Sequence, residues 1–401
     1  MKIYRIGIDC RLWGETGVGR YIRNLVSNLQ EIDKTNEYVL FALPKNKPDI
    51  QSIIHNSHLR QGFGGQAKFK IVSADIKWHS VREQFEFPKI LEKENLDLVH
   101  FPYFSMPIYY KGKYVLTIHD LIINHFPTGK ASTLPSFIYY SKYLAYKYVL
   151  SQAIKNAEKI ITVSQATEKE IEDHYGVPSI KLAVIYEGVD QAISPSASSG
   201  QANDQGRKTK DQLPNNYFLY VGNAYPHKNL EFLINAFSQM INDKGLMMKD
   251  ISLVLIGKED HFYKRLETKV KEMGLKQNVL FKHDVNDQDL ASLYQNALAL
   301  VAPSLMEGFG LPLLEAMDDN CLVVASDIPV FHEVCGDAAV YVDPHDKEAM
   351  VNVLLSVYNK QVKNEKEKKK IGKKRVSFFS WKKMAQETLA VYEGCFGLRQ
   401  S

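Results

Sequence analysis

Apolar residues gather in short runs that alternate with longer amphipathic stretches along most of the chain. Runs such as "KIYRIGID", "YVLFAL", "LDLVHF" and "YVLTIHD" have the length and composition of buried strands. The intervening stretches, such as "VGRYIRNLVSNLQEI", repeat apolar residues at helical spacing. This alternation predicts an α/β fold in which helices cover both faces of a parallel sheet.

The alternation begins again after residue 214, with "YFLYVG" and then "NLEFLINAFSQMI". We therefore predict two Rossmann-like, doubly wound domains that face a central cleft, at residues 1–193 and 214–375. Residues 194–213 are polar and form a predicted linker or insertion, and residues 55–70 form a second predicted insertion. Residues 376–401 are predicted to form a separate C-terminal helix.

The composition agrees with a globular protein of two domains. The chain has 401 residues, 45% hydrophobic and 24% charged, and its net charge of +4 is mild. Such a charge suits anionic small molecules or an anionic membrane surface and gives little reason to expect nucleic acid as a partner. The four cysteines are far apart, and no apolar run reaches about 18 residues, so we expect a cytoplasmic protein without a membrane span.

Candidate chemistry lies where predicted strands end, because open α/β sheets bind ligands at the carboxyl ends of their strands. In the first half, Gly17 and Gly19 in "TGVGRYIRNL" separate a strand from a helix and can bring backbone amides close to a phosphate. A tight turn explains these glycines equally well. His119 ends "YVLTIH" and can exchange a hydrogen bond with a bound hydroxyl, with Asp120 orienting it, although a loop histidine beside a helix cap fits too.

In the second half, "YVGNAYPHKNLEF" places His227 and Lys228 between a strand and a helix. A lysine fixed there suits a diphosphate, although surface lysines are common. Asp287 and Asp289 match the Asp-x-Asp pattern of metal-dependent sugar transferases. They directly precede a helical run, so helix capping is the preferred interpretation and no metal is predicted.

The stretch "SLMEGFGLPLLEAM" carries two glutamates with seven residues between them, Glu307 and Glu315. Gly308 and Gly310 can expose backbone amides, and Pro312 suits the first turn of a helix. We expect Glu315 in that first turn, where the helix dipole alone explains an acidic residue. Glu307 lies in the loop, where no such explanation applies.

These strand ends together resemble the retaining glycosyltransferases of the large family-four group, which have the GT-B fold. The resemblance covers nearly the whole chain and includes "TIHDL", "ITVSQATEKEI", "VIYEGVD" and "VAPSLMEGFGLPLLEAM". The closing "FSWKKMAQETLAVYE" is similar to the last helix of that family, which crosses back to the first domain.

The resemblance implies a role for each matching residue. His119, Lys228 and Glu307 would be the catalytic residues: His119 would reach the sugar, Lys228 would neutralise the departing diphosphate, and Glu307 would hold hydroxyls of the transferred sugar. Glu315 would bind the ribose. The other implied donor-binding residues are Gly17, His227, Val285, Gly308, Phe309, Gly310 and Leu311.

One position departs from the family pattern, because family members usually carry Arg where this chain has His227. Either Lys228 supplies most of the charge, or phosphates keep His227 protonated. Arg11 or Arg20 is a further candidate for supplying charge.

The expected reaction is metal-independent transfer of a hexose from a nucleotide diphosphate sugar to a hydroxyl of a glycan or lipid-linked acceptor, without a cofactor. The family pattern favours mannose from GDP-mannose in polysaccharide or lipopolysaccharide assembly, followed by a UDP-hexose. The alternatives are a nucleotide-sugar epimerase or a phosphorylase on the same scaffold, and a non-catalytic nucleotide-sugar binder. The tyrosine- and lysine-rich residues 137–159 suggest peripheral contact with an anionic membrane, although core packing explains their spacing better.

Overall fold

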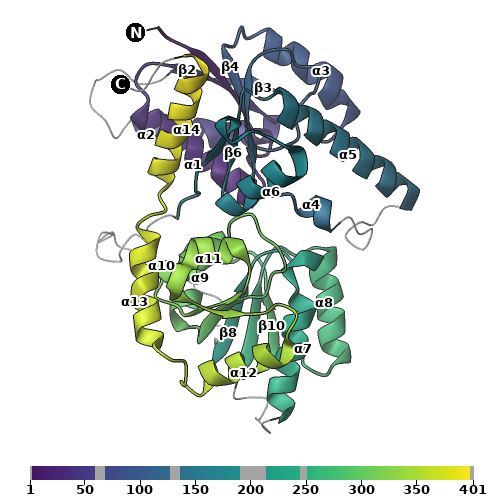
Figure 1. The fold of residues 1–401 in the computed structure, drawn as a ribbon, viewed down its shortest axis with the longest axis vertical. Coiled ribbons are helices and arrows are strands. Elements are labelled where there is room, and N and C mark those ends of the chain that lie inside the picture. Colours follow the sequence, from purple (N-terminus) through teal and green to yellow (C-terminus); the bar gives the residue numbers. More distant parts are fainter. Residues whose placement is uncertain (1, 59–67, 127–135, 190–213, 244–250, 398–401) are drawn as a thin grey trace, which may run out of the picture. The chain divides into compact units, whose positions relative to one another are not determined.

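A computed structural model describes residues 2–58, 68–126, 136–189, 214–243 and 251–397 (Figure 1). The chain forms two compact units. Unit 1 comprises residues 1–188 together with 379–401, and unit 2 comprises residues 189–378. The predicted linker at 194–213 lies outside the described residues, as does most of the predicted insertion at 55–70.

Unit 1 contains a seven-stranded parallel sheet in the order β3-β2-β1-β4-β5-β6-β7. The strand order reverses between β1 and β4, and such a switch point places ligands at the carboxyl ends of the strands. The strands are β1 (Arg5–Asp9), β2 (Glu37–Ala42), β3 (Lys68–Ser73), β4 (Leu98–Phe101), β5 (Tyr114–Ile118), β6 (Lys159–Thr162) and β7 (Leu182–Val184).

Helices lie on both faces of this sheet (Figure 1). They are α1 (Gly17–Ile32), α2 (Lys47–His58), α3 (Val81–Glu92), α4 (Ile122–His125), α5 (Ser136–Asn156), α6 (Gln165–Tyr175) and α14 (Trp381–Cys395), with 3₁₀ turns η1 (Pro44–Asn46) and η3 (Ser179–Lys181). Because both faces are covered, the interior strand β5 is buried at all five residues, as its largely apolar sequence predicts. The C-terminal helix α14 packs against α1, so the predicted return of this helix to the first domain is confirmed.

Unit 2 contains a six-stranded parallel sheet in the order β10-β9-β8-β11-β12-β13, which reverses between β8 and β11. Its strands are β8 (Tyr217–Val221), β9 (Ser252–Ile256), β10 (Val279–Lys282), β11 (Ala299–Ala302), β12 (Val323–Ser326) and β13 (Ala339–Val342). Its helices are α7 (Leu230–Asp243), α8 (His261–Glu272), α9 (Asp287–Asn296), α10 (Leu311–Asp318), α11 (Pro329–Cys335), α12 (Lys347–Tyr358) and α13 (Glu365–Val376), with 3₁₀ turns η5 (Pro226–Lys228) and η6 (Gly336–Ala338). The prediction of two doubly wound domains is therefore confirmed.

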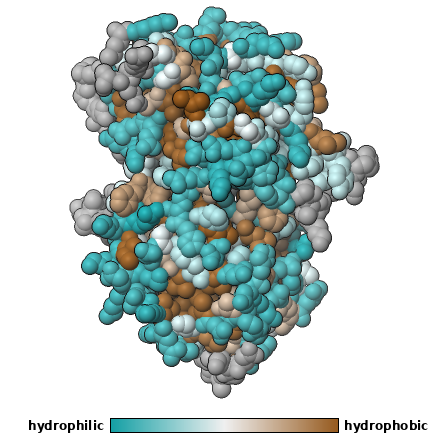
Figure 2. Space-filling view, viewed as in Figure 1, coloured by the Kyte–Doolittle hydropathy of each residue, from teal (hydrophilic) through white to brown (hydrophobic). Residues whose placement is uncertain are grey.

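The long helix α5 uses its two sides differently. Tyr146 packs edge-on against Phe104, with ring centroids 4.9 Å apart, which agrees with core packing. Three residues spaced four apart, Tyr140, Leu144 and Tyr148, are exposed. Hydrophilic residues cover most of the molecular face in Figure 2. Within the described part of the chain, no helix combines the length and apolar character needed to cross a bilayer.

Candidate active site

Lys228 lies in a rigid turn after the first strand of unit 2. β8 ends at Val221, and Pro226 begins the short η5 turn that contains Lys228. Asn229 follows in the left-handed region, with φ of 59°, and its side-chain amide donates to the Pro344 carbonyl at 2.9 Å. The turn is therefore fixed at both ends, and the lysine side chain leaves it from a defined backbone.

Glu307 lies in the loop after β11, the strand that pairs with β8. Its two carboxylate oxygens accept hydrogen bonds from Lys228 Nζ at 2.6 and 2.7 Å. Ser304 Oγ donates to the same carboxylate at 2.7 Å. The Leu305 amide donates to the His227 carbonyl at 2.8 Å and ties the two loops together. The structure thus brings together two predicted site residues that are 79 positions apart.

The charges of this pair are well defined. Burial raises the pKa of Glu307, but the charge and hydrogen bond of Lys228, with smaller contributions from His227 and Ser304, together bring it below the usual glutamate value. The side chains of Lys228 and Glu307 are 16% and 15% exposed, so both remain accessible to a ligand. Burial and then the Lys228 charge lower the pKa of His227 to about 4. His227 is therefore neutral in the ligand-free protein, and Lys228 is the charged member of this turn.

The glycine-bearing loop after Glu307 leads into helix α10. Gly310 precedes the helix with φ of 113°, a conformation that side chains with a Cβ rarely adopt, and a Cβ there would lie 3.1 Å from Phe331. Pro312 occupies the first turn, as predicted. Gly308 and Phe309 are buried, whereas Leu311 is half-buried at the start of the helix.

The expectation that Glu315 lies in the first helical turn is wrong. α10 begins at Leu311, so Glu315 is its fifth residue, and the first turn contains no acidic residue. The Tyr294 hydroxyl donates to Glu315 Oε2 at 2.8 Å. An interaction with the N-terminal helix dipole therefore no longer explains Glu315, and a carboxylate oriented by a tyrosine is a stronger candidate for binding hydroxyls.

Val285 and the Asp-x-Asp sequence lie between β10 and α9. Val285 is half-buried, and Asn286 is the N-cap of α9, where its side chain accepts from the Asp289 amide at 2.9 Å. Asp287 and Asp289 fall in the first turn of this helix. The preferred capping interpretation is thus correct in kind, with Asn286 as the cap and the aspartates next to the helix dipole.

In unit 1, both ring nitrogens of His119 have partners. Nδ1 lies 3.1 Å from Glu187 Oε1, and Nε2 lies 3.0 Å from the Pro102 carbonyl oxygen. Burial lowers the pKa of His119, but the hydrogen bond and charge of Glu187, with smaller contributions from the Pro102 carbonyl and Asp120, together raise it above the usual histidine value. Both partners accept hydrogen bonds, so the protonated ring satisfies both. Glu187 therefore holds His119, a role that the sequence had suggested for Asp120.

The two glycines of the first loop have different surroundings. Gly17 is the first residue of α1 and is exposed, and a Cβ there would meet nothing within 4 Å. A Cβ on Gly19 would lie 2.6 Å from the Trp13 carbonyl oxygen, so Gly19 is needed for close packing. Gly17 is thus exposed at the N-terminal end of α1, and its contact with a diphosphate stays a prediction.

Arg11 cannot supply charge to a ligand, which contradicts one sequence-based suggestion. Its guanidinium is 1% exposed and pairs with Asp9 at 2.6 Å and Glu83 at 2.7 Å. It also lies 3.9 Å above the ring of Phe87. This arginine belongs to the interior of unit 1.

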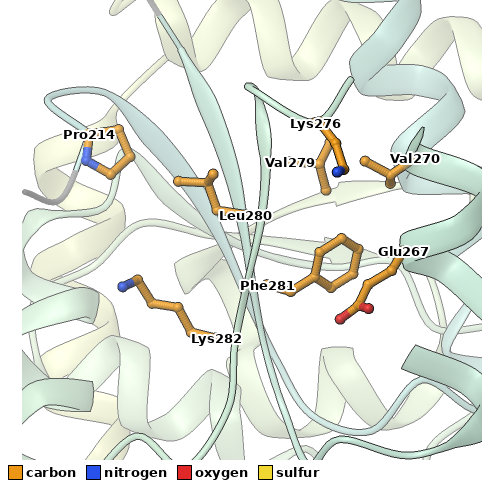
Figure 3. A pocket seen from close by; sticks show the side chains of 8 residues that line it. All are labelled: Pro214, Glu267, Val270, Lys276, Val279, Leu280, Phe281 and Lys282. Atoms are coloured by element: carbon orange, nitrogen blue, oxygen red, sulfur yellow. The ribbon is translucent and has the colours of Figure 1, made fainter. Parts of the chain in front are cut away.

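A surface hollow of about 720 Å³ surrounds strand β10 and contains none of the predicted site residues. Figure 3 shows Leu280 and Lys282 on one side of the strand and Phe281 on the other. Among the described residues β10 pairs with β9 alone. The hollow therefore follows the edge of the sheet and is not part of the candidate active site.

Comparisons with known proteins agree with this geometry. A family model described as Glycosyltransferase Family 4 matches residues 16–192, and one described as Glycosyl transferases group 1 matches residues 202–375. The chain is 33% identical over 242 residues to the O-antigen chain mannosyltransferase RfbU of Salmonella typhimurium, a match that spans 60% of either chain. It is 25% identical to the O-antigen chain mannosyltransferase B of Escherichia coli, over 94% of this chain and 96% of that protein.

Among solved structures, the sucrose-phosphate synthase of Thermosynechococcus elongatus is similar, with a TM-score of 0.72 at 19% identity. The alignment covers 99% of this chain and 100% of that structure. At this level of identity the similarity shows a shared fold. The two family models together span most of the sequence, and this chain therefore belongs to the family-four, group 1 glycosyltransferases, with their GT-B fold.

Proposed function

We propose that this glycosyltransferase moves a hexose, with mannose favoured, from a nucleotide diphosphate sugar to a hydroxyl of a glycan or lipid-linked acceptor. The observation that carries the proposal is the ion pair of Lys228 and Glu307 at the carboxyl ends of two neighbouring strands. The mannosyltransferase names of the two relatives support the choice of sugar. The donor is GDP-mannose or a UDP-hexose, and the product extends a surface polysaccharide such as a lipopolysaccharide chain.

Lys228 and Glu307 divide the work of binding the donor. As the sugar leaves, negative charge builds on the diphosphate, and the Lys228 ammonium stabilises it. Loss of one such contact typically costs about 2.7–4 kcal/mol of transition-state stabilisation. Glu307, kept ionised by Lys228, accepts hydrogen bonds from sugar hydroxyls. In the free protein each group is the partner of the other, so neither charge is buried alone.

The proposed reaction retains the anomeric configuration and uses neither metal nor cofactor. The acceptor oxygen attacks C1 on the face from which the diphosphate departs. The bond from C1 to the diphosphate breaks, the bond to the acceptor oxygen forms, and the diphosphate oxygen takes the hydroxyl proton. Lys228 supplies the positive charge that a metal ion provides in other transferases. Transfer that continues unchanged in EDTA, with a product of the donor's anomeric configuration by NMR, is the expected result.

A donor screen by thermal shift tests the proposal. A nucleotide sugar at 100 times its dissociation constant stabilises the folded protein by about 2.7 kcal/mol. We expect this stabilisation with GDP-mannose or with a UDP-hexose, and slow hydrolysis of the same donor without acceptor. Tight binding without turnover of any donor would support a non-catalytic binder.

We also propose a cytoplasmic location with peripheral contact of α5 at the inner face of the membrane. Tyr140, Leu144 and Tyr148 form an exposed stripe along this helix, and the exposed Lys142 and Lys147 add positive charge. Aromatic and aliphatic side chains with flanking lysines suit an anionic lipid surface. Sedimentation with anionic vesicles should show weak binding that salt removes, and no binding at low salt would contradict the idea.

A further inference from the structure

A second pocket in unit 1 lies outside the proposed donor-binding residues. It has a volume of about 430 Å³ and lies just past the carboxyl ends of β2 and β3. Gly17 and His119 follow β1 and β5 of the same parallel sheet, so the pocket occupies the edge at which ligands are expected. Its lining residues are Leu43, Pro44, Lys45, Asp75, Lys77 and Trp78.

The pocket combines one aromatic ring with three charged side chains. Trp78 is half-buried, whereas Lys45, Asp75 and Lys77 are exposed. Within the part of the chain that the structure describes, none of these four side chains forms a hydrogen bond or ion pair. Two hydrogen-bond donors and one acceptor thus line the pocket beside the indole, and they are available to a ligand.

Hydrogen bonds from neighbouring elements hold the backbone of the loop that contains Trp78. The Ala74 amide donates to the Ala42 carbonyl at 2.9 Å, and the buried Arg11 guanidinium donates to the Ile76 carbonyl at 3.3 Å. Glu83 accepts from the His79 amide at 2.9 Å and pairs with Arg11 at 2.7 Å. The buried network of Arg11, which the donor site does not use, therefore fixes the backbone of this loop.

The backbone directly after Trp78 is also constrained. His79 has φ of 58°, in the left-handed region that residues other than glycine rarely adopt. Such conformations persist where surrounding structure enforces them, and they concentrate at ligand-binding sites. The backbone on both sides of Trp78, a residue that lines the pocket, is therefore held in place.

We propose that this pocket is a subsite for a pyranose residue of the acceptor glycan. A sugar ring has an apolar face of C–H groups, which suits the negative face of an indole, and a rim of hydroxyls, which suits ammonium and carboxylate partners. Lys45 and Lys77 would donate to ring hydroxyls, and Asp75 would accept from them. The inference rests on the proposed function, because it assigns a sugar residue of the proposed acceptor to unit 1.

The position of the pocket agrees with a sugar beyond the reacting one. Neighbouring strands of a sheet lie about 4.8 Å apart, so β2 and β3 are displaced by about 5 and 10 Å from β1. Gly17, the proposed contact of the diphosphate, follows β1. A pyranose on Trp78 would therefore lie to one side of the proposed contact with the diphosphate.

Saturation-transfer NMR tests the subsite with simple probes: the methyl pyranosides of mannose, glucose, galactose and N-acetylglucosamine. With the wild-type protein we expect a saturation-transfer signal from at least one pyranoside. Binding of that pyranoside should weaken at least tenfold in Trp78→Ala and should recover in Trp78→Phe. Tyr109→Ala is the matched control, because Tyr109 is also an exposed aromatic of unit 1 but lies outside the pocket. The control should bind like the wild type.

Three results would overturn the subsite. They are the absence of a saturation-transfer signal from every pyranoside, a signal that persists in Trp78→Ala, and a shift of the Trp78 indole resonance with inorganic phosphate alone. Donor hydrolysis without acceptor is measured on the same samples and should be unchanged in Trp78→Ala. Absence of donor hydrolysis in the wild-type protein would contradict the proposed function. Normal hydrolysis without binding of a pyranoside at Trp78 would contradict the subsite alone.

Discussion

The two units each contain a cluster of opposite charges near strand ends, and the two clusters differ in their access to solvent. In unit 1 the Arg11 and Glu83 side chains are each 1% exposed. In unit 2 the Lys228 and Glu307 side chains are 16% and 15% exposed, although their ion pair is just as short. The sealed cluster can act only on its own protein, whereas the open cluster can exchange its partners for a ligand. Solvent access therefore separates the residues that shape the fold from those that bind the donor.

The largest expected effect is the loss of stability when the sealed cluster is broken. Among the residues that the structure describes, Arg11 is the cation that pairs with the buried carboxylates of Asp9 and Glu83, and Arg11→Met removes it. The free energy of unfolding should fall by about 3–5 kcal/mol, measured by urea denaturation. Arg82→Met, which breaks the exposed pair with Glu86, is the control and should be close to the wild type. Equal stability of both variants would show that the buried network does not support unit 1.

Substitutions in the open cluster, Lys228 and Glu307, should lower activity much more than stability. Lys228→Ala and Glu307→Gln should each lower turnover of the true donor at least a hundredfold, because each removes a contact to the transition state. Their urea denaturation curves should shift less than that of Arg11→Met, since the Lys228 and Glu307 side chains keep 16% and 15% of their surface exposed. Near-normal turnover in purified variants would remove these residues from the active site.

Acidification tests the burial of His100 in the interior of unit 1. Burial lowers the pKa of His100 to about 3, and its ring nitrogens contact Tyr392 and Thr117. Below a pH of about 6.5 the His100 side chain is protonated in the unfolded chain but stays neutral in the folded protein. The free energy of unfolding therefore falls as the pH decreases towards 3. Between pH 7 and pH 5 the expected loss from this residue is about 2 kcal/mol.

The measurement is the difference between the wild type and His100→Gln in urea denaturation at the two pH values. The variant should lack the contribution of His100, and His174→Gln, at an exposed position, should keep the wild-type pH dependence. The same pH dependence in all three proteins would mean that His100 is not kept neutral by burial.

The smallest effect is expected at the proposed ribose contact. Tyr294→Phe removes the hydroxyl that donates to Glu315 at 2.8 Å. Loss of one such hydrogen bond should weaken donor binding by about 1 kcal/mol, or about fivefold. Calorimetric titration with the nucleoside diphosphate measures it, and Glu315→Gln should weaken binding at least as much. Unchanged affinity in both variants would place the ribose elsewhere.

Much of the fold and part of the site could be predicted from the sequence, because both depend on local patterns. Buried parallel strands are unbroken apolar runs, and β8 and β11 each end directly before a loop with an unexplained charge. Those loops contain Lys228 and Glu307, which the structure joins. The predicted position of Glu315 in the first turn is wrong because the helix begins at Leu311, one residue before Pro312, and Glu315 therefore falls in the second turn.

What could not be predicted depends on contacts between distant residues. Glu187 holds His119 from 68 positions away, and nothing near either residue in the sequence indicates this pairing. Arg11 follows a strand end and looked available to a ligand, yet Glu83, 72 positions away, seals it in the interior. Charged residues at strand ends are easy to find, but their burial is known only from the packing around them.

The most direct test of the Lys228–Glu307 site is calorimetric titration of three proteins with a nucleoside diphosphate and with its hexose conjugate. The nucleotide is GDP or UDP, whichever gives the larger thermal shift. Lys228→Ala should weaken binding of the diphosphate itself at least tenfold. Glu307→Gln should leave that binding intact and remove the difference in affinity between GDP-mannose and GDP, or between the UDP pair. Wild-type affinities in Lys228→Ala, with an unchanged sugar-dependent difference in Glu307→Gln, would contradict the account.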